Sequence, residues 1–516
     1  MDCEINIDSI RALEEQIREH EKVVIKLKRA RNSLLNVSKL PPEVLSKIFH
    51  WNVTFKGDFD GLDEGSHNFL FVCHHWFEVA SRTPELWSFW GNTLKDWTRW
   101  CRRSGTAPLD LVLDSGDCDD NHLDPILYNV LQSCATRDAI RRIHLAAEDS
   151  ELLSSIIVPL TSNSELRSNG LESFALWNNR GVGMDVSDSF AHYRFPKLQC
   201  LDIDNCTLSW DYLSSRTSVL TTLIILHPLL DPTKSQLLSI LASNPALQIV
   251  VLRGCRVTDD GGDNSSRVQL RQLEELWLEG GLRLVVGLLR QLDHPRNLGS
   301  LTLRLYNSEV VDISQIIGPY LQDHLQHRDR PQNGLDLCFS SMDSAKYYMD
   351  TIEFSASDGG TDFSAPASAP FVTICILLNG VHRKSVLERA ALDLITHIPP
   401  DQVVSLRTYC NPVVTEDTWT QFPNLRALSF DTISLPAAFP IPSLIADGKV
   451  FPSLEYVLLG SVVMDNGDWS PLMAFLACRA SSGNRLDTLA IAGSTHVCQQ
   501  VAKDIGAMVR ELKFYQ

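Results

Sequence analysis

One pattern recurs along most of this chain and limits what it can fold into. It reads Leu-x-x-Leu-x-Leu, with other aliphatic residues or Phe allowed at the leucine positions. The copies begin at Ile140, Leu171, Leu198, Leu220, Leu247, Leu273, Leu298, Leu425, Leu454 and Leu486. An alternating Leu-x-Leu pair predicts a short strand with one buried face. Because a single unit cannot bury that face alone, neighbouring units are expected to stack.

Several copies also share the residues that lead into the strand. These lead-ins are Phe195-Pro196-Lys197-Leu198, Asn244-Pro245-Ala246-Leu247, Phe422-Pro423-Asn424-Leu425 and Phe451-Pro452-Ser453-Leu454. The six copies from Leu171 to Leu298 begin 27, 22, 27, 26 and 25 residues apart. A period of about 20–29 residues resembles that of leucine-rich repeats.

Between the strands, the segments Ser235 to Ala242 and Leu282 to Leu292 have helical periodicity. Each repeat is therefore expected to hold a strand followed by a helix or an irregular turn. For residues 101–516 we expect an α/β fold, an irregular leucine-rich-repeat solenoid with a parallel sheet on its concave side. The pattern blurs between about 305 and 400. Within that stretch we expect a flexible loop at 355–370 and a buried strand over 371–378.

Residues 5–36 are expected to form one helix, since no proline interrupts them before Pro41. Ile10, Leu13, Ile17, Val24, Leu27 and Leu34 fall on one stripe with 3-4 spacing, and His20 and Arg31 occupy its two remaining positions. This is a short, imperfect coiled-coil seam. Two interpretations stay open: the helix forms a homodimer, or it packs singly on the next domain.

A second set of motifs lies between residues 40 and 87. It comprises Leu40-Pro41-Pro42-Glu43-Val44-Leu45-Ser46-Lys47-Ile48-Phe49, then Val72-Cys73-His74-His75-Trp76, then Pro84-Glu85-Leu86-Trp87. We expect a helix that opens at the two prolines, a second helix from Phe69 to Ala80, and a short third segment at Pro84. Residues 52–68 are acidic and glycine-rich, which predicts an inserted loop.

Taken in this order, the motifs resemble an F-box. With the helix before it and the repeats after it, the chain resembles the large group of fungal F-box proteins. The resemblance divides the chain into 1–37 (amphipathic helix), 38–100 (small all-helical F-box module) and 101–516 (repeats). The inserted loop at 52–68 departs from the compact family pattern.

The resemblance implies a function. In that family the F-box docks on the Skp adaptor, which links it to a cullin–RING scaffold, and the repeats bind the protein to be ubiquitinated. By position, the implied adaptor contacts are Leu40, Pro41, Pro42, Glu43, Val44, Leu45, Ile48, Phe49, Val72, Trp76, Leu86 and Trp87.

For the substrate protein we expect contacts from strand residues that flank the buried leucine positions. The candidates are Trp177, Asp202, Asp204, Arg253, Trp277, Glu279 and Arg304. Trp and Arg are common where binding energy concentrates at interfaces. The alternative is that these are ordinary exposed residues of a sheet.

Composition excludes several other classes. A net charge of −17 and a pI near 5.3 argue against nucleic-acid binding. The start of the chain lacks the basic and apolar regions of a signal peptide, and the longest apolar run is far short of a membrane span. We therefore expect no membrane contact and a cytoplasmic or nuclear location. The 13 cysteines include no Cys-x-x-Cys, so we expect buried thiols and no metal.

No hydrolase, metalloprotease or phosphate-loop motif occurs, so we expect a non-catalytic chain without a cofactor. The alternative to a ligase subunit is a leucine-rich-repeat scaffold whose F-box-like module has no link to ubiquitination.

Overall fold

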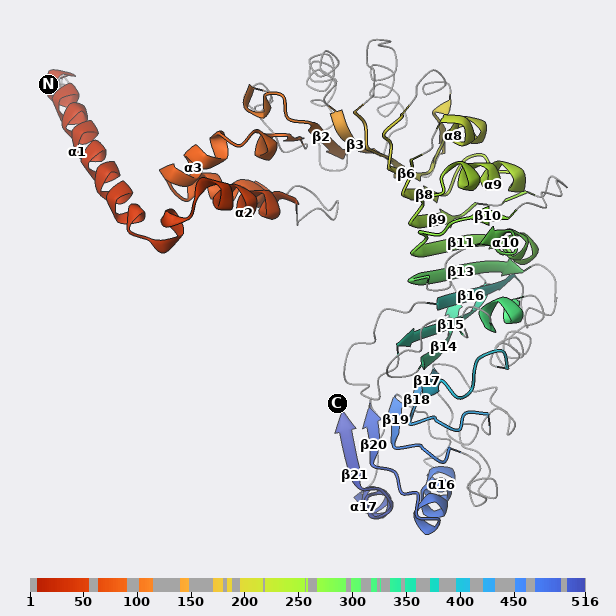
Figure 1. Cartoon of the computed structure of the whole chain (residues 1–516). Coiled ribbons are helices and arrows are strands. Elements are labelled where there is room, and N and C mark those ends of the chain that lie inside the picture. Colours follow the sequence, from red (N-terminus) through yellow and green to blue (C-terminus); the bar gives the residue numbers. More distant parts are fainter. Residues whose placement is uncertain are drawn as a thin grey trace, which may run out of the picture. The chain divides into compact units, whose positions relative to one another are not determined.

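The structure is a computed structural model of the whole chain. It describes residues 7–54, 64–90, 102–114, 140–147, 170–179, 183–187, 195–216, 219–255, 257–258, 267–293, 298–307, 317–322, 325, 335–344, 349–358, 372–379, 396–408, 421–431, 451–460, 469–492 and 499–515. The chain divides into two compact units, Met1–Ser209 and Trp210–Gln516. Figure 1 labels the helices and strands along the chain. The fold is mixed α/β, with helices and mostly parallel strands.

The first unit begins with helices. α1 (Ile7–Ser33) confirms a long N-terminal helix, but it ends at Ser33 and not at residue 36, because the chain turns there into a 3-10 helix, η1 (Asn36–Lys39). α2 (Pro42–Thr54) starts at the proline pair, as expected from the low cost of proline in a first helical turn. The remaining helical elements are η2 (Glu64–Phe71), α3 (His74–Ser81) and η3 (Pro84–Trp87).

Two boundaries in this region differ from the expected ones. The second helix begins at His74 and not at Phe69, because Cys73 is extended (φ −162°) and separates η2 from α3. The inserted loop is narrower than 52–68. Helix α2 continues to Thr54 and η2 already begins at Glu64, while residues 55–63 lie outside the described residues.

A parallel sheet completes the first unit. Its strands pair side by side in chain order: β1 (Phe89–Trp90), β2 (Leu109–Asp114), β3 (Ile140–Ala147), β4 (Ser173–Asn178) and β6 (Cys200–Asp204). Two short strands, β5 (Met184–Asp185) and β7 (Cys206–Thr207), form a separate parallel pair.

The second unit opens with the same arrangement. Here too the strands pair in parallel and in chain order: β8 (Thr222–Leu226), β9 (Ile249–Arg253), β11 (Glu275–Gly281) and β13 (Ser300–Asn307). Three helices come before or between these strands: α8 (Trp210–Arg216), α9 (Lys234–Ser243) and α10 (Leu282–Leu289). α9 confirms the helical segment predicted over Ser235 to Ala242. α10 confirms the second helix, but it ends at Leu289, and Leu292, where the predicted segment ended, belongs to a strand. Short strands β10 (Val268–Gln269) and β12 (Leu292–Asp293) pair separately.

An antiparallel strand then interrupts the parallel order. β13 pairs with β16 (Val372–Asn379), and β15 (Met349–Asp358) runs antiparallel between β16 and β14 (Leu335–Ser344). β16 confirms the strand predicted over 371–378. The expected loop at 355–370 begins too early. Ser355–Asp358 belong to β15, where all four pair with β14 and the first two also pair with β16, which holds them extended. Residues 359–370 lie outside the described residues.

Parallel pairing resumes from β14 to the C-terminus. The strands are β17 (Val403–Thr408), β18 (Ala427–Asp431), β19 (Tyr456–Gly460), β20 (Thr488–Ala492) and β21 (Glu511–Tyr515). Helices α16 (Ser470–Ser481) and α17 (Gln499–Met508) precede the last two.

The residues at the leucine positions of the pattern form the hydrophobic core beneath the strands. All ten predicted strands form, and in β9 and β11 the leucine positions Val250, Leu252, Leu276 and Leu278 are buried. The lead-in residues form one kind of turn, in which the amide of the first leucine donates to the carbonyl three residues earlier. This bond is 3.2 Å in Leu198–Phe195 and Leu454–Phe451, and 3.3 Å in Leu425–Phe422. None of the helices that the structure describes is long and apolar enough to cross a bilayer.

Candidate partner-binding surfaces

The helical module has its own small core. Leu45 and Phe49 of α2 are buried together with Leu86 and Trp87 of η3. Phe49 stacks on Phe69 with ring centroids 4.6 Å apart. The motif residues of the two segments therefore meet in space, although nearly 40 positions separate them in the sequence.

Trp87 joins the third segment to α3. Its indole Nε1 donates a 2.7 Å hydrogen bond to the Ala80 carbonyl, at the end of that helix. The guanidinium of Arg103 lies 4.1 Å above the Trp87 ring, a cation–π contact. Buried on one face and covered by a cation on the other, Trp87 positions η3 against the rest of the module.

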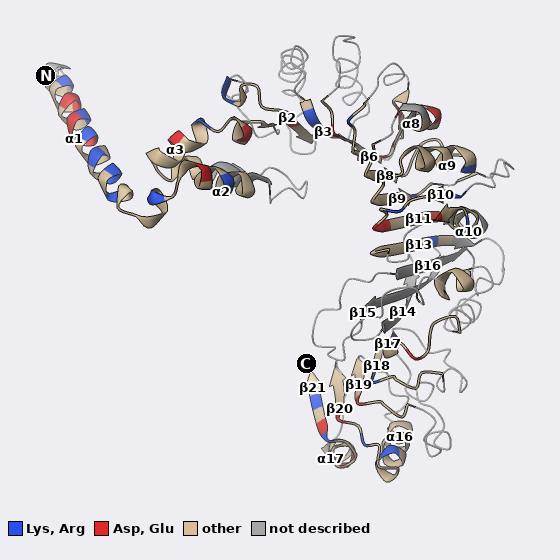
Figure 2. Cartoon of the chain, in the orientation of Figure 1, with Lys and Arg blue, Asp and Glu red and all other residues tan. Residues whose placement is uncertain are grey.

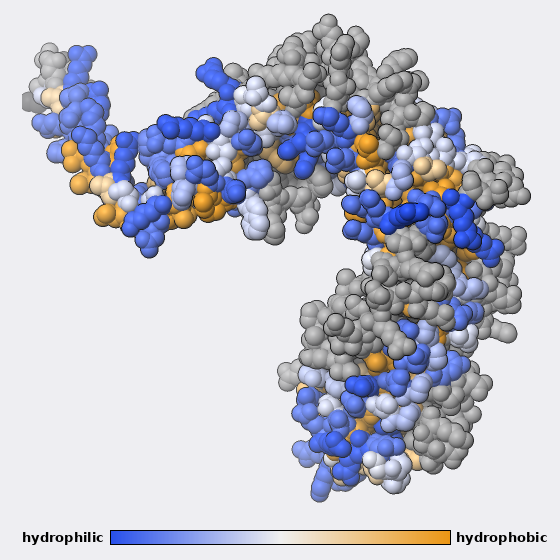
Figure 3. All heavy atoms as spheres, viewed as in Figure 1, coloured by the Kyte–Doolittle hydropathy of each residue, from blue (hydrophilic) through white to orange (hydrophobic). Residues whose placement is uncertain are grey.

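A different set of side chains on α2 faces outward. Val44 and Ile48 are 41% and 46% exposed, and Trp51 is 70% exposed. Their i, i+4, i+7 spacing places them on one stripe, roughly 100° round the helix from Leu45 and Phe49. Phe71 and Val72, just before α3, are exposed as well. We call Val44, Ile48 and Trp51 the apolar stripe, and Figure 3 shows hydrophobic surface over this part of the module.

The predicted adaptor contacts thus separate into two groups. Leu45, Phe49, Leu86 and Trp87 are core residues, and Leu40 and Trp76 pack against that core. The exposed ones are Pro41, Pro42, Glu43, Val44, Ile48 and Val72. Trp51 and Phe71 belong to the exposed surface but were not predicted. The i+7 spacing of Trp51 from Val44 is the signal that identifies it.

The module leads directly into the first sheet. The amide of Asp110 in β2 donates a 2.8 Å bond to the carbonyl of Ser88, one residue after η3. Phe89 and Trp90 then pair in register with Asp110 and Leu111. The backbone of the helical module is therefore hydrogen-bonded to the strands that follow it.

On one face of that sheet lie three of the predicted substrate contacts. Trp177 is in register with Asp204, and Asp202 lies beside Ala175 on the next strand. The His144 ring packs edge-on against Trp177 with centroids 4.4 Å apart. Burial raises the pKa of the Asp202 carboxyl to about 6, and the negative charge of Asp204 adds to the shift while the Trp177 indole opposes it. The face is acidic and aromatic.

The other four predicted contacts gather on a face of the second unit. Glu279 of β11 is in register with Arg304 of β13, and Arg253 follows Leu252, the register partner of Leu278, on β9. Glu279 is only 4% exposed. Its Oε2 lies 3.7 Å from Arg253 Nε and 3.8 Å from Arg304 Nη1. Two positive side chains therefore flank one buried carboxylate.

This cluster retains hydrogen-bonding capacity. Arg253 Nε, Arg304 Nε and Trp277 Nε1 are buried and donate no hydrogen bond within the part of the chain that the structure describes. The Arg253 guanidinium also lies 5.9 Å from the centre of the Trp277 ring. A buried donor without an acceptor costs roughly 1–3 kcal/mol. An incoming carboxylate or phosphate oxygen would satisfy such donors and the surplus positive charge.

Two buried cysteines, Cys206 and Cys255, have thiols that stay protonated. Burial raises the pKa of Cys206 to about 12 and also raises that of Cys255. Within the described ranges, no group of three or more His, Cys, Asp or Glu side chains is arranged to hold a metal ion.

No protein-family model matches this chain, and a search of curated proteins gave no match. The features of this chain that bear on its function are the motifs between residues 40 and 87, the apolar stripe and the two polar sheet faces.

Proposed function

We propose that this chain is the substrate-recognition subunit of a Skp–cullin–F-box ubiquitin ligase. In this proposal the helical module binds the Skp adaptor, and the strands of the two units belong to an irregular leucine-rich-repeat solenoid that binds the protein to be ubiquitinated. The chain itself is not catalytic. It raises the effective concentration of a substrate lysine near the enzyme that carries ubiquitin.

The apolar stripe is the observation that supports the proposal most. In the module, half of the F-box-like residues form a core, while Val44 and Ile48 remain exposed beside Trp51. Large apolar side chains exposed in a row are typical of a surface that a partner covers. A module that served only to pack on its own chain would have no need of such a stripe.

Binding of purified Skp adaptor to the full chain tests the proposal. Val44→Asp/Ile48→Asp places two charges on the stripe and leaves the core unchanged. We expect the wild type to co-purify with the adaptor and the double variant to bind at least about tenfold more weakly, as for charges introduced at an interface centre. Leu45 is unsuitable as a test position, because a charge there would unfold the module.

His50→Asp is the matched control. His50 is exposed on the same helix, roughly 130° round from the stripe, so a charge there should leave adaptor binding unchanged. Circular dichroism melting of all three proteins checks that the module stays folded. Failure of folded wild-type protein to bind would refute the ligase proposal and favour the alternative, a repeat scaffold with an F-box-like module.

The sheet faces supply the proposed substrate surface. The Arg253–Glu279–Arg304 cluster carries one surplus positive charge and unpaired donors, so it suits a partner segment with acidic side chains. The Trp177–Asp202–Asp204 face carries the opposite charge. Arg253→Glu/Arg304→Glu should abolish capture of such a substrate while leaving adaptor binding intact.

A further inference from the structure

α1 carries an apolar seam that the rest of the described chain does not cover. Its seam residues Ile10, Leu13, Ile17, Val24 and Leu27 are 45–65% exposed. The interpretation in which the helix packs singly on the next domain would require them to be buried. A helix of 27 residues with such a seam is about 40 Å long, just under four heptads of a coiled coil.

Charge is segregated along the same helix, as Figure 2 shows. Between Ile7 and Glu21 there are five acidic and two basic residues. Between Lys22 and Ser33 there are five basic residues and no acidic ones. The two halves of α1 therefore carry net charges of −3 and +5. Acidic residues near the start of the helix and basic residues near its end also interact favourably with the helix dipole. The dipole does not explain why the apolar seam is exposed.

We propose that α1 pairs with α1 of a second copy of this chain, and that the two helices run antiparallel. In a parallel pair the basic halves would lie against each other, with Arg31 facing Arg31 and His20 facing His20 in the seam. An antiparallel pair sets each acidic half against a basic half. It also places each polar seam residue opposite an apolar one. This proposal is independent of the ligase proposal.

The seam fixes one register. When the pair is centred on residue 22, Ile10 faces Leu34 of the second copy and Ile17 faces Leu27. Arg31 faces Leu13 and His20 faces Val24. Each contact occurs twice by symmetry. Six of the eight seam positions are apolar, and the last of them, Leu34, directly follows the end of α1. Such a short seam suits a weak, reversible dimer.

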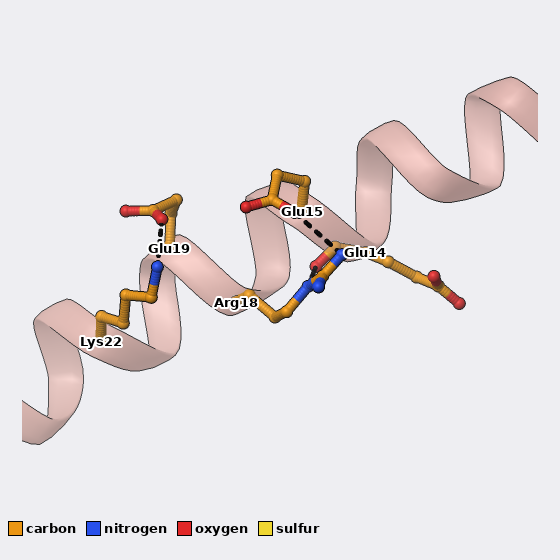
Figure 4. Close-up of polar contacts among 5 residues, drawn as sticks. All are labelled: Glu14, Glu15, Arg18, Glu19 and Lys22. Atoms are coloured by element: carbon orange, nitrogen blue, oxygen red, sulfur yellow. Dashed lines mark hydrogen bonds and ion pairs between the residues drawn. The ribbon is translucent and has the colours of Figure 1, made fainter.

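In this register Glu14 lies beside Lys28 of the second copy, on the flank of the seam. Within a single chain, the Glu14 carboxylate and the Lys28 ammonium group are both available for such an ion pair. Arg18 forms an ion pair with the Glu15 carboxylate at 2.8 Å. From Glu14 it contacts only the backbone carbonyl, to which it donates a hydrogen bond, and the Glu14 carboxylate points away from Arg18 in Figure 4. Lys22 pairs with Glu19 at 2.6 Å. Neither the Glu14 carboxylate nor Lys28 has an ion-pair partner within the described residues.

A charge-swap series on the full chain tests both the pairing and its direction. We expect wild type to show about twice the 57.8 kDa chain mass by light scattering at tens of micromolar. Glu14→Lys and Lys28→Glu should each weaken the dimer about 3–10-fold. The double swap should restore it, because the two sites face each other only in the antiparallel pair.

Glu15→Lys/Arg29→Glu is the control, since both residues point away from the seam and should leave dimerisation unchanged. Glu21→Gln is a second measurement. Glu21 faces Glu21 of the second copy in this register, so the neutral variant should dimerise several-fold more tightly. Wild type that stays monomeric at these concentrations would overturn the pairing. A double swap no stronger than the single variants would overturn the antiparallel direction.

Discussion

Arg479 of α16 donates a 2.8 Å hydrogen bond from Nη1 to the carbonyl of Phe451, at the start of the lead-in to β19. A second bond of 2.8 Å runs from Nη2 to the carbonyl of Leu454. The side chain is buried, and burial lowers the pKa of its guanidinium to about 10. α16 thus holds the turn that opens β19, the strand before it.

Arg479→Met should destabilise the second unit by about 2–4 kcal/mol. It removes two charge-assisted hydrogen bonds and leaves two buried carbonyls without these donors, while the apolar volume is largely kept. Urea denaturation monitored by circular dichroism measures the change. Arg485→Met, at an exposed position just after the same helix, should change the free energy of unfolding by less than about 0.5 kcal/mol. Equal effects of the two variants would contradict this role for Arg479.

Gly254→Ala should destabilise the strand that carries Arg253. Gly254 has a φ of +68°, and a Cβ there would lie 2.6 Å from Cδ2 of His227. Left-handed strain and the steric clash together should cost roughly 2–4 kcal/mol. Gly483→Ala separates the two causes, because Gly483 has a φ of +83° but nothing within 4 Å of the added atom. Its variant should lose only about 1 kcal/mol in thermal melts.

Asp202→Asn should change stability in a pH-dependent way. The folded-state pKa of about 6 lies above the ordinary value of 3.8, so the folded protein holds this proton more tightly than the unfolded chain does. Wild-type stability from this group is therefore present below about pH 4 and is lost as the pH rises through 6. The variant, which never ionises, should match wild type at pH 4 and exceed it by roughly 1–2 kcal/mol at pH 7.5.

Denaturation of both proteins at the two pH values provides the measurement. A stability difference that is the same at pH 4 and pH 7.5 would show that ionisation of Asp202 is not its cause. Asp185→Asn, at an exposed position on β5, is the control and should show no pH-dependent difference.

Glu279→Gln should destabilise the second unit by about 1–3 kcal/mol. The substitution keeps the shape of the side chain but leaves Arg253 and Arg304 facing each other without the intervening negative charge. Glu275→Gln alters the same strand at a less buried site and should have a much smaller effect. Thermal unfolding at low and high salt distinguishes them, because added salt should reduce the loss caused by Glu279→Gln.

The sequence predicted the strands well, because each one depends on a local pattern. Leu276 and Leu278 are separated by the non-aliphatic Trp277, and this alternation can be recognised in the sequence without knowing which strands pair. The antiparallel placement of β15 could not be predicted in this way. Its direction depends on the pairing of β15 with two other strands, in which Phe354 lies opposite Phe339 and Ile374, and no leucine pattern encodes that pairing.

The same distinction between local pattern and tertiary pairing applies to the candidate site residues. The F-box-like motif identified Leu45 and Ile48 as neighbours in sequence, but the structure was needed to show that one is core and the other surface. The placement of Arg253 and Arg304 on either side of Glu279 depends on the register of three strands. From the sequence each of these residues was predicted separately as a partner contact. Only the pairing of β9, β11 and β13 brings them together.

The antiparallel insertion also has a consequence for how the second unit folds. Most parallel pairs join strands about 25 residues apart, but Leu301 of β13 pairs with Val372 of β16, 71 positions later. Closing the longer loop costs about 1 kcal/mol more in chain entropy, and such non-local contacts form slowly. Strands on either side can associate before this closure. We therefore expect the pairing of β13 with β16 to be a late step of folding and the first to open when denaturant is added.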